Sequence, residues 1–263
     1  MRIAVIGCGY LGAVHAACMA EIGHNVVGLD VDEDRVSRLA QGEAPFHEPG
    51  FPEILARTVA SGRLDFTTDP RRLSNADLVF IGVGTPQLSG RLGADLSQID
   101  AAIDTIIEHL APGPGTPALV VGKSTVPVGT AQRLAKRLEA SGKNVLLAWN
   151  PEFLREGHAV ADTLHPDRIV YGLPEDRAAG ERAKALLDAC YAPMLAENIP
   201  LVVANLPTAE LVKVAANAFL ATKISFINAM AELCDATGGD VTRLAEAIGH
   251  DDRIGGKFLQ AGI

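Results

Sequence analysis

Short apolar runs alternate with longer amphipathic stretches over the first two hundred residues. The runs, rich in Val, Ile and Leu, are RIAVIG (2–7), NVVGLD (25–30), DLVFIGVG (77–84), PALVVG (117–122), NVLLAWN (144–150), DRIVYG (167–172) and IPLVVAN (199–205). Short continuous apolar strands separated by amphipathic helices are typical of a parallel sheet that is buried on both faces. The pattern therefore predicts an α/β fold, a Rossmann-like doubly wound and mostly parallel sheet.

The pattern changes after Asn205. Residues 207–237 contain no glycine, and no proline after the first position, which predicts one helix of about thirty residues. This helix is apolar on more than one face, so we expect it to be buried between domains or between subunits. Residues 240–249 predict a short helix with Asp240 as its N-cap. The chain is thus expected to divide into a domain at 1–204 and a helical central region at 205–263.

Composition narrows the possible partners. The 263 residues carry a net charge of −9 and hold no basic cluster, which argues against a nucleic-acid surface. No uninterrupted apolar run approaches the ~18 residues of a membrane span, and no secretory signal opens the chain. We therefore expect a cytoplasmic protein without a membrane partner.

The cysteines are expected to be reduced and buried. They are Cys8, Cys18, Cys190 and Cys234. Their spacing is not that of a metal site, and no metal is implied.

A glycine pattern marks the first strand-to-helix turn. Gly7, Gly9 and Gly12 form G-x-G-x-x-G directly after the first predicted strand. In this context the first glycine permits the tight turn, the second lets the backbone approach a pyrophosphate, and the third lets helix and strand pack closely. The N-terminus of the helix would offer free N–H groups to the phosphates. We predict a dinucleotide site.

The second predicted strand ends at Asp30, eighteen residues beyond Gly12. A carboxylate at this place accepts hydrogen bonds from a ribose diol and repels a 2′-phosphate, which favours NAD over NADP. Arg35 complicates the prediction, because an arginine there could accommodate a phosphate. Asp30 could instead simply cap the next helix.

Two further polar clusters follow predicted strands. GVGTP (82–86) lies where open α/β sheets bind ligands, although an ordinary turn would have the same composition. GKSTVPVGT (122–130) places Ser124, Thr125 and Thr130 within seven residues of a strand end. A loop that caps the next helix through Thr130 explains part of this run of hydroxyls and not all of it.

NPEFLREG (150–157) carries Glu152 and Glu156, which would share a face if they lay on one helical turn. Two carboxylates beside a nicotinamide could act as general base or position a water; the alternative is a solvated helix start.

Lys213 and Asn217 share a face of the long apolar helix. A cation beside an amide can stabilise an alkoxide, whereas a lysine without function would extend its head to solvent.

Taken in order along the chain, these motifs resemble the nucleotide-sugar dehydrogenases, the family of the UDP-glucose and GDP-mannose dehydrogenases. The resemblance covers essentially the whole chain and is carried by VIGCGYLG, LDVDEDRV, EPG, GTP, KSTVPVGT, NPEFLREG, PDRIVYG, AELVKVAANAFLATKISFINAMAELC and DDRIGGKFL. It implies NAD-dependent oxidation of UDP-glucose to UDP-glucuronate. In this chemistry two hydrides leave C6 in turn, and a cysteine captures the aldehyde and forms a thioester that water hydrolyses.

The resemblance also implies roles for residues. Thr125, Glu152 and Glu156 would handle water and protons, with the choice of general base between the two glutamates left open. Lys213 and Asn217 would stabilise the oxyanion. The implied NAD contacts are Gly7, Gly9, Tyr10, Leu11, Gly12, Asp30, Arg35, Thr85, Pro86, Ser124, Thr125 and Glu156. The implied substrate contacts are Glu152, Phe153, Leu154, Arg155, Lys213, Asn217 and Arg253, the last reaching a neighbouring subunit's substrate. The long helix resembles the family's dimer-forming helix, which implies a homodimer.

The resemblance further implies that GKFL (256–259) precedes the catalytic cysteine and a second Rossmann-like domain. We therefore expect this chain to lack the nucleophile and to fall short of the double oxidation. Two alternatives stay open: the substrate could be GDP-mannose or an N-acetylated UDP-sugar, or the chain is a non-catalytic NAD-binding module. A β-hydroxyacid dehydrogenase also places Lys and Asn on a helix after such a domain, but the EPG and KSTVPVGT segments argue against it.

Overall fold

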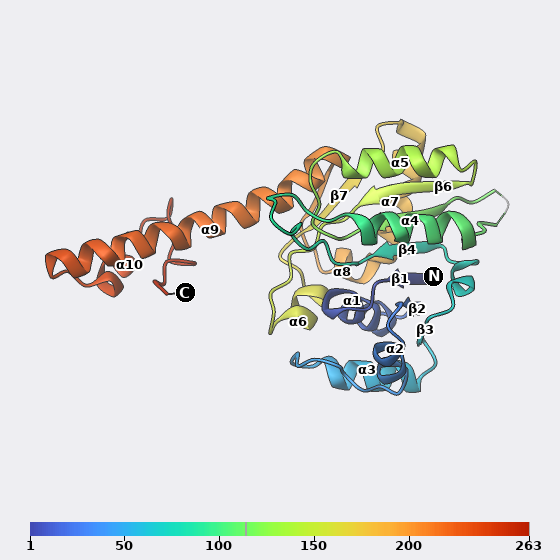
Figure 1. Cartoon of the computed structure of the whole chain (residues 1–263), viewed down its shortest axis with the longest axis horizontal. Coiled ribbons are helices and arrows are strands. Elements are labelled where there is room, and N and C mark those ends of the chain that lie inside the picture. The colour runs from blue at the N-terminus through green and yellow to red at the C-terminus, as the bar shows by residue number, and fades with distance from the viewer. Residues whose placement is uncertain (114, 263) are drawn as a thin grey trace. The chain divides into compact units, whose positions relative to one another are not determined.

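The computed structural model describes residues 1–113 and 115–262. It divides into two compact units, Met1–Leu211 and Val212–Ile263, which are described separately below. The first unit contains the sheet, and the second consists of most of the long helix and the segment that follows it (Figure 1).

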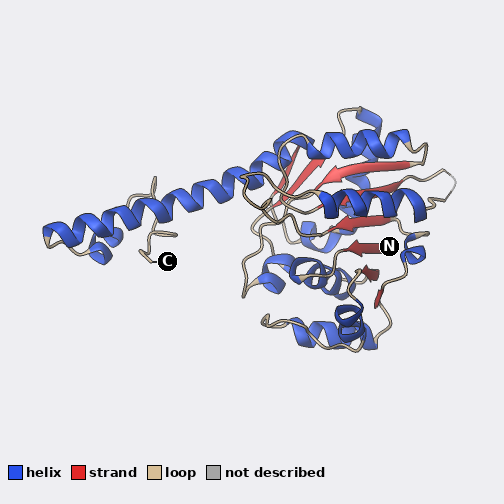
Figure 2. Ribbon diagram, viewed as in Figure 1, coloured by secondary structure: helices blue, strands red, loops and turns tan. Residues whose placement is uncertain are grey.

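The first unit is built on an eight-stranded sheet, drawn in red in Figure 2. Its strand order is β3-β2-β1-β4-β5-β6-β7-β8. Neighbouring strands are parallel except for β6 and β7, which are antiparallel. The predicted Rossmann-like, mostly parallel fold is confirmed. The strands are β1 (Arg2–Ile6), β2 (Asn25–Leu29), β3 (Leu64–Thr67), β4 (Leu78–Ile81), β5 (Ala118–Gly122), β6 (Val145–Trp149), β7 (Ile169–Leu173) and β8 (Leu201–Asn205).

Helices cover both faces of the sheet because strand residues alternate in direction and both faces are apolar. The 3₁₀ helix η1 (Pro70–Leu73) precedes β4. One core lies between the sheet and α1 (Tyr10–Glu21), α2 (Glu33–Ala40), α3 (Phe51–Ala60), α6 (Ala159–Leu164), α7 (Arg177–Cys190) and α8 (Ala192–Ala196). The other face buries apolar side chains of α4 (Ser97–His109) and α5 (Thr130–Ala140).

The sheet reverses its order between β1 and β4. Ile6 at the end of β1 is in register with Ile81 at the end of β4. The backbone N–H of Gly82 donates to the carbonyl of Ile6 at 2.9 Å, which brings the two following loops together. In open α/β sheets, ligands bind at the carboxyl edge where the strand order reverses. The fold therefore places the glycine loop and GVGTP at the position of a nucleotide site.

The long helix α9 (Leu206–Thr237) and the helix α10 (Val241–Gly249) confirm the predicted change of pattern. Asp240 caps α10, accepting the backbone N–H groups of Thr242 at 2.8 Å and Arg243 at 3.2 Å. The apolar surface of α9 is largely exposed in this chain, for example Phe219 at 66% and Phe226 at 48%. We expected α9 to be buried between domains or subunits. The described residues of this chain do not cover it.

By length and composition, α9 could cross a membrane, and it is the one such helix in the described part of the chain. The core helix of a soluble protein meets the same criterion, so this observation alone carries little weight. Charged residues Glu210, Lys213, Lys223, Glu232 and Asp235 are distributed along its length.

Candidate active site

The glycine loop after β1 is shaped by contacts that exclude side chains. Gly7 has φ +89°, and a Cβ there would lie 2.7 Å from Val83 Cγ1. A Cβ on Gly12 would lie 1.8 Å from the carbonyl oxygen of Gly7, so helix and loop approach as closely as backbone allows. A Cβ on Gly9 would meet nothing within 4 Å. The second glycine therefore borders open space, which fits the close approach of a pyrophosphate.

Helix α1 begins at Tyr10 with Gly9 as its N-cap, and no side chain caps it. Its first turn contains no acidic residue. The free N–H groups and the partial positive charge at this end favour an anion. The Leu11 side chain is half-buried beside Gly82, in the wall between the glycine loop and the loop after β4.

Asp30 braces the glycine loop from the end of β2. Its Oδ2 accepts the N–H of Cys8 at 2.6 Å, and its Oδ1 accepts the N–H of Asp32 at 3.0 Å. The cap of α2 is Asp32, which accepts the N–H of Arg35 at 3.0 Å. Asp30 is therefore not the helix cap that an alternative interpretation allowed.

Arg35 is held between two carboxylates. Its Nη1 lies 3.1 Å from both oxygens of Asp30, and its Nη2 lies 3.1 Å from Asp32 Oδ2. A guanidinium engaged in this way is already neutralised and is poorly placed to accept a 2′-phosphate. The arrangement supports NAD over NADP. Val31, 96% exposed between the two aspartates, offers an apolar surface beside the ribose position that sequence reasoning missed.

The loops after β4 and β5 are joined to each other. The hydroxyl of Thr85 donates to the carbonyl of Thr125 at 2.7 Å, and the hydroxyl of Ser124 donates to the carbonyl of Val83 at 2.6 Å. Ser124 is buried and acts as a brace, whereas Thr125 and Pro86 are exposed. The GVGTP and GKSTVPVGT clusters thus meet beside the glycine loop.

Thr130 does not cap α5. Its hydroxyl donates to the carbonyl of Pro127 at 2.7 Å. The cap is supplied by Glu210, at the start of α9, whose oxygens accept the N–H of Gly129 at 2.7 Å and of Ala131 at 2.6 Å. Burial raises the pKa of Glu210, and its two backbone hydrogen bonds oppose the shift. No local pattern could predict this contact, because the two segments are about eighty residues apart.

Glu152 and Glu156 do not share a helical face, because residues 151–156 form no helix and α6 begins only at Ala159. Glu152 is partly buried, and its Oε1 accepts the N–H groups of Phe153 at 2.8 Å and Leu154 at 3.2 Å. Its Oε2 lies 3.0 Å from Nζ of Lys123. Glu156 is exposed in a turn. The i, i+4 prediction failed because these two hydrogen bonds fold the backbone into an irregular loop.

Phe153 and Arg155, two of the predicted substrate contacts, are fixed by contacts with other residues of the same unit. Arg155 donates from its backbone N–H to Asp162 Oδ2 at 2.9 Å and from its guanidinium to both Asp162 oxygens. The guanidinium of Arg168 lies 4.0 Å from the centre of the Phe153 ring. These contacts order the loop without a ligand.

Glu48, of the EPG motif, is a structural centre that residue-by-residue reasoning did not identify. It is 1% exposed and accepts three hydrogen bonds: from the hydroxyl of Tyr10, from the N–H of Gly157 at 2.9 Å and from the N–H of Ala159 at 2.7 Å. Burial, and then the hydrogen bond to Glu48, raise the pKa of Tyr10 to about 12. Glu48 thus ties the start of α1 to the end of the Glu152–Gly157 loop.

The cysteines are free and buried, as predicted. Burial raises the pKa of Cys8, Cys18 and Cys190, so each holds its proton and none of these three suits a thiolate nucleophile. Among the described residues, no group of three or more His, Cys, Asp or Glu side chains could hold a metal ion.

Three predicted site residues lie in the second unit. Lys213, which is half-buried, and Asn217, which is exposed, are one turn apart on α9. Arg253 is paired with Asp251, its Nε 3.0 Å from Oδ1 and its Nη2 2.6 Å from Oδ2. Their catalytic and substrate-binding roles stay predictions.

Comparison with known proteins matches both units to one family. Residues 1–195 match the NAD binding domain of the UDP-glucose/GDP-mannose dehydrogenase family, and residues 207–263 match its central domain. The chain is 45% identical to the UDP-glucose 6-dehydrogenase of Rhizobium meliloti (strain 1021), with 100% of this chain and 59% of the relative aligned.

Solved structures show the same relation. A UDP-glucose dehydrogenase from the archaeon Pyrobaculum islandicum superposes with a TM-score of 0.88 at 41% identity, covering 99% of this chain and 59% of the other. A GDP-mannose dehydrogenase from Pseudomonas aeruginosa has the same TM-score at 31% identity, covering 95% and 57%. The chain thus spans less than two thirds of the length of each of these proteins.

Proposed function

This chain belongs to the UDP-glucose/GDP-mannose dehydrogenase family, and on that premise we propose that the protein oxidises C6 of UDP-glucose to the carboxylate of UDP-glucuronate, using two molecules of NAD. The substrate is chosen by similarity: identity is 45% and 41% to two proteins named for UDP-glucose and 31% to one named for GDP-mannose. The motifs NPEFLREG and KSTVPVGT favour the same choice.

The residues present fit NAD. The open space at Gly9, the uncapped start of α1 and the Asp30 carboxylate provide the three features that a dinucleotide requires: room for the pyrophosphate, N–H donors and a ribose acceptor. When bound, NAD supplies the hydride acceptor. The protein orients it through the loops after β1, β2, β4 and β5.

The observation that carries the proposal is the convergence of these loops. Gly82 is bonded to the end of β1, Ser124 to Val83, and Thr85 to Thr125, so the nucleotide loop and the hydroxyl cluster form one edge. We assign Thr125, Glu152 and Glu156 to the water and the protons beside C6. Lys213 and Asn217 would stabilise the alkoxide as it forms.

The nucleophilic cysteine of the proposed chemistry is assigned to a part of the protein outside these 263 residues. All four cysteines here are buried, and burial raises the pKa of three of them. We therefore expect these residues alone to bind NAD and not to complete the double oxidation.

The test uses the gene read to its natural stop. NADH formation is followed by absorbance with UDP-glucose as limiting substrate, beside GDP-mannose and UDP-N-acetylglucosamine. Two NADH per UDP-glucose is the expected result. A preference for another sugar would assign the protein to that substrate. NAD binding without NADH from any sugar would support the non-catalytic module in place of the enzyme.

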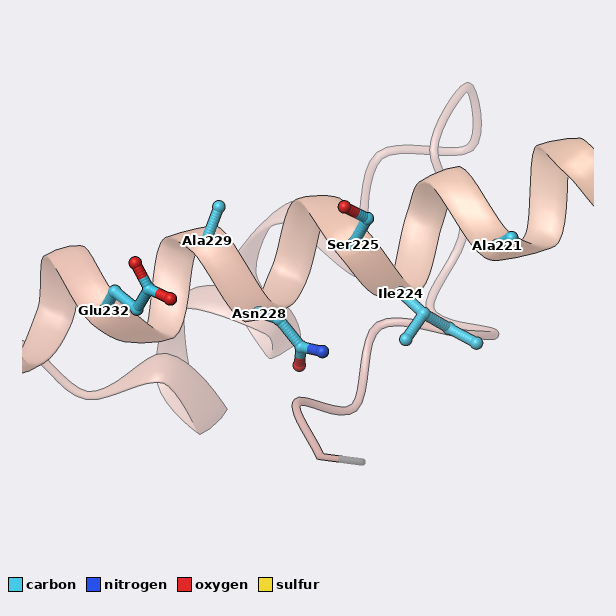
Figure 3. A pocket seen from close by; sticks show the side chains of 6 residues that line it. All are labelled: Ala221, Ile224, Ser225, Asn228, Ala229 and Glu232. Atoms are coloured by element: carbon cyan, nitrogen blue, oxygen red, sulfur yellow. The ribbon is translucent and has the colours of Figure 1, made fainter. Parts of the chain in front are cut away.

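We also propose that the exposed apolar face of α9 packs against a second copy of the protein. Figure 3 shows part of the exposed surface of α9, where Ala221, Ser225 and Ala229 lie one turn apart beside Ile224, Asn228 and Glu232. Small side chains let a second helix approach closely. The second copy, and not a membrane, would then cover the apolar surface of α9.

Light scattering on the full-length protein tests the dimer. Ile224→Asp places a charge among the α9 residues shown in Figure 3 and should convert a dimer to a monomer, whereas Leu92→Asp, at a 99% exposed position on a loop of the first unit, should leave the mass unchanged. A monomeric wild-type protein would refute the assignment.

A further inference from the structure

Lys123 is a buried lysine with no assigned role in the proposed chemistry. It follows β5 directly, and its side chain is only 6% exposed. A long charged side chain normally keeps its head in water, and burying it is costly unless partners replace the water. The partners of Lys123 therefore indicate what it is for.

Two of those partners lie in the loop that follows the neighbouring strand, β6. Nζ donates to Asn150 Oδ1 at 3.0 Å and lies 3.0 Å from Glu152 Oε2. Asn150 is itself fixed, since its Oδ1 accepts the Tyr191 hydroxyl at 2.6 Å and its Nδ2 donates to the carbonyl of Val170 at 2.9 Å. The Phe80 ring lies 5.9 Å from Nζ. The ammonium is thus held by a buried hydrogen-bond network that runs through Asn150.

Glu152 is the exposed end of this network. Its Oε1 is occupied by the N–H groups of its own loop, and Lys123 is the contact that sets the direction of Oε2. Without the ammonium, the carboxylate would keep its loop hydrogen bonds through Oε1, while Oε2 would lose the contact that directs it and could swing towards water. The orientation of Glu152 therefore depends on Lys123.

We propose that Lys123 is a positioning residue, which holds the Glu152 carboxylate aimed at the reacting end of the site, with Asn150 and Tyr191 fixing Lys123 in turn. This inference rests on the proposed function, because it assigns Lys123 to the same chemistry. Lys123 acts through Glu152 and is not itself assigned to touch the substrate.

The pair can be tested without reference to activity, by calorimetry of the full-length protein. Removing one partner of a buried ion pair is strongly destabilising, while removing both is often nearly neutral. Lys123→Met and Glu152→Gln should each lower the Tm by roughly 10 °C. The double variant should lose less than the sum of the two, and additive losses would overturn the pairing.

The positioning role is tested by a cycle in kcat. Lys123→Met should lower kcat by roughly 100-fold, the scale of a misplaced catalytic group, with little change in KM for NAD. In the Glu152→Gln background the same substitution should change kcat little, because nothing remains to be positioned. Lys123→Arg keeps the charge and should recover part of kcat.

A matched control distinguishes general damage from positioning. Lys143 is half-buried, and its Nζ donates to the carbonyl of Leu110 at 2.6 Å at the opposite edge of the sheet. Lys143→Met should lower Tm without lowering kcat. Wild-type kcat in Lys123→Met, or losses that multiply in the double variant, would overturn the role. If the wild-type protein oxidises no sugar, the proposed function fails, and the Tm cycle still decides whether the pair exists.

Discussion

Glu48 offers the sharpest test of how the site is held together. Its two oxygens accept hydrogen bonds from three donors, the Tyr10 hydroxyl and the N–H groups of Gly157 and Ala159, and the side chain is 1% exposed. Glu48→Gln keeps the shape and replaces one acceptor oxygen by an NH₂ group. Whichever way the amide turns, this NH₂ faces at least one backbone or hydroxyl donor.

The magnitude follows from this geometry. In the better orientation the amide oxygen keeps Tyr10 and Gly157, and the N–H of Ala159 is left buried without an acceptor, at about 1–3 kcal/mol. The two remaining bonds lose the strength of a charged acceptor, by roughly 1 kcal/mol each, and the easier burial of a neutral group offsets part of this. We expect a loss of about 3 kcal/mol in the free energy of unfolding. Tyr10→Phe removes one donor to the charged carboxylate and should cost less, about 1.5–2 kcal/mol.

Urea unfolding, followed by circular dichroism, measures both variants. With a slope of about 2–3 kcal/mol per molar urea, Glu48→Gln should lower the midpoint by about 1 M. The pKa of Tyr10 gives a second sign of the same contact, since the folded state holds this proton up to about pH 12. Its contribution to stability is present below the ordinary value of 10.0 and is lost as the pH rises through 12, and Tyr10→Phe should remove that part of the alkaline loss. An unchanged midpoint in Glu48→Gln, or a larger loss in Tyr10→Phe, would refute the reasoning.

Three further substitutions probe other buried groups. Asp30→Ala should weaken NAD binding by roughly 10- to 100-fold, because hydrogen bonds to a charged acceptor are lost. It should weaken NADP binding less, because Arg35 loses its partner. Fluorescence titration of both cofactors measures these two affinities. Burial lowers the pKa of His15, whose ring nitrogens have no partner, so stability falls as the pH drops below 6.5, where the unfolded chain takes up the proton. His15→Leu should flatten this slope by up to about 1.4 kcal/mol per pH unit, while His24, whose pKa is also lowered by burial, keeps its share. Glu210→Ala should cost about 1–2 kcal/mol as a lost helix cap, and hydrogen exchange should show it first at the start of α5.

Periodicity and turn residues were sufficient to predict the class of architecture and seven of the eight strands. The edge strand β3 was missed, because its four residues, LDFT, include a charged, exposed Asp65 and form no continuous apolar run. The strand runs, the glycine turn after β1, the length of α9 and the Asp240 cap are local features, and each was read correctly from a few neighbouring residues. The direction of β7 was not predictable in this way. Whether a strand runs parallel to its neighbour depends on the path of the connection, and the connection from β6 to β7 contains only the short helix α6 in place of a full crossover.

The site was less predictable because its contacts are distant in the sequence. The i, i+4 spacing of Glu152 and Glu156 assumed a helix, and the structure has a loop there. Lys123 is 29 residues from Glu152, and Glu48 is 109 residues from Gly157. A spacing argument applies only within one element. It therefore identified which residues cluster at strand ends, and it missed Glu48, Glu210 and Lys123, which help to hold those clusters in place.

Four buried or partly buried carboxylates share one task at this edge of the sheet: each accepts two backbone N–H groups from a loop that carries the site. Asp30 accepts them in the glycine loop and after β2, Glu48 before α6, Glu152 after β6 and Glu210 at the start of α5. Loops contain N–H groups that no strand or helix satisfies, and a carboxylate can accept several of them. The site is thereby ordered before a ligand arrives, which lowers the entropy lost on binding.

The same pattern distinguishes the four acids chemically. At Asp30, Glu48 and Glu210 the two N–H groups are divided between the two carboxylate oxygens, so an amide, with one acceptor oxygen, must leave one of them unsatisfied. At Glu152 a single oxygen accepts both, and the other faces Lys123. An amide there can keep the loop and lose only the ion pair. Glu152 is therefore the one acid of the four whose amide variant separates the shape of the loop from the charge of the site.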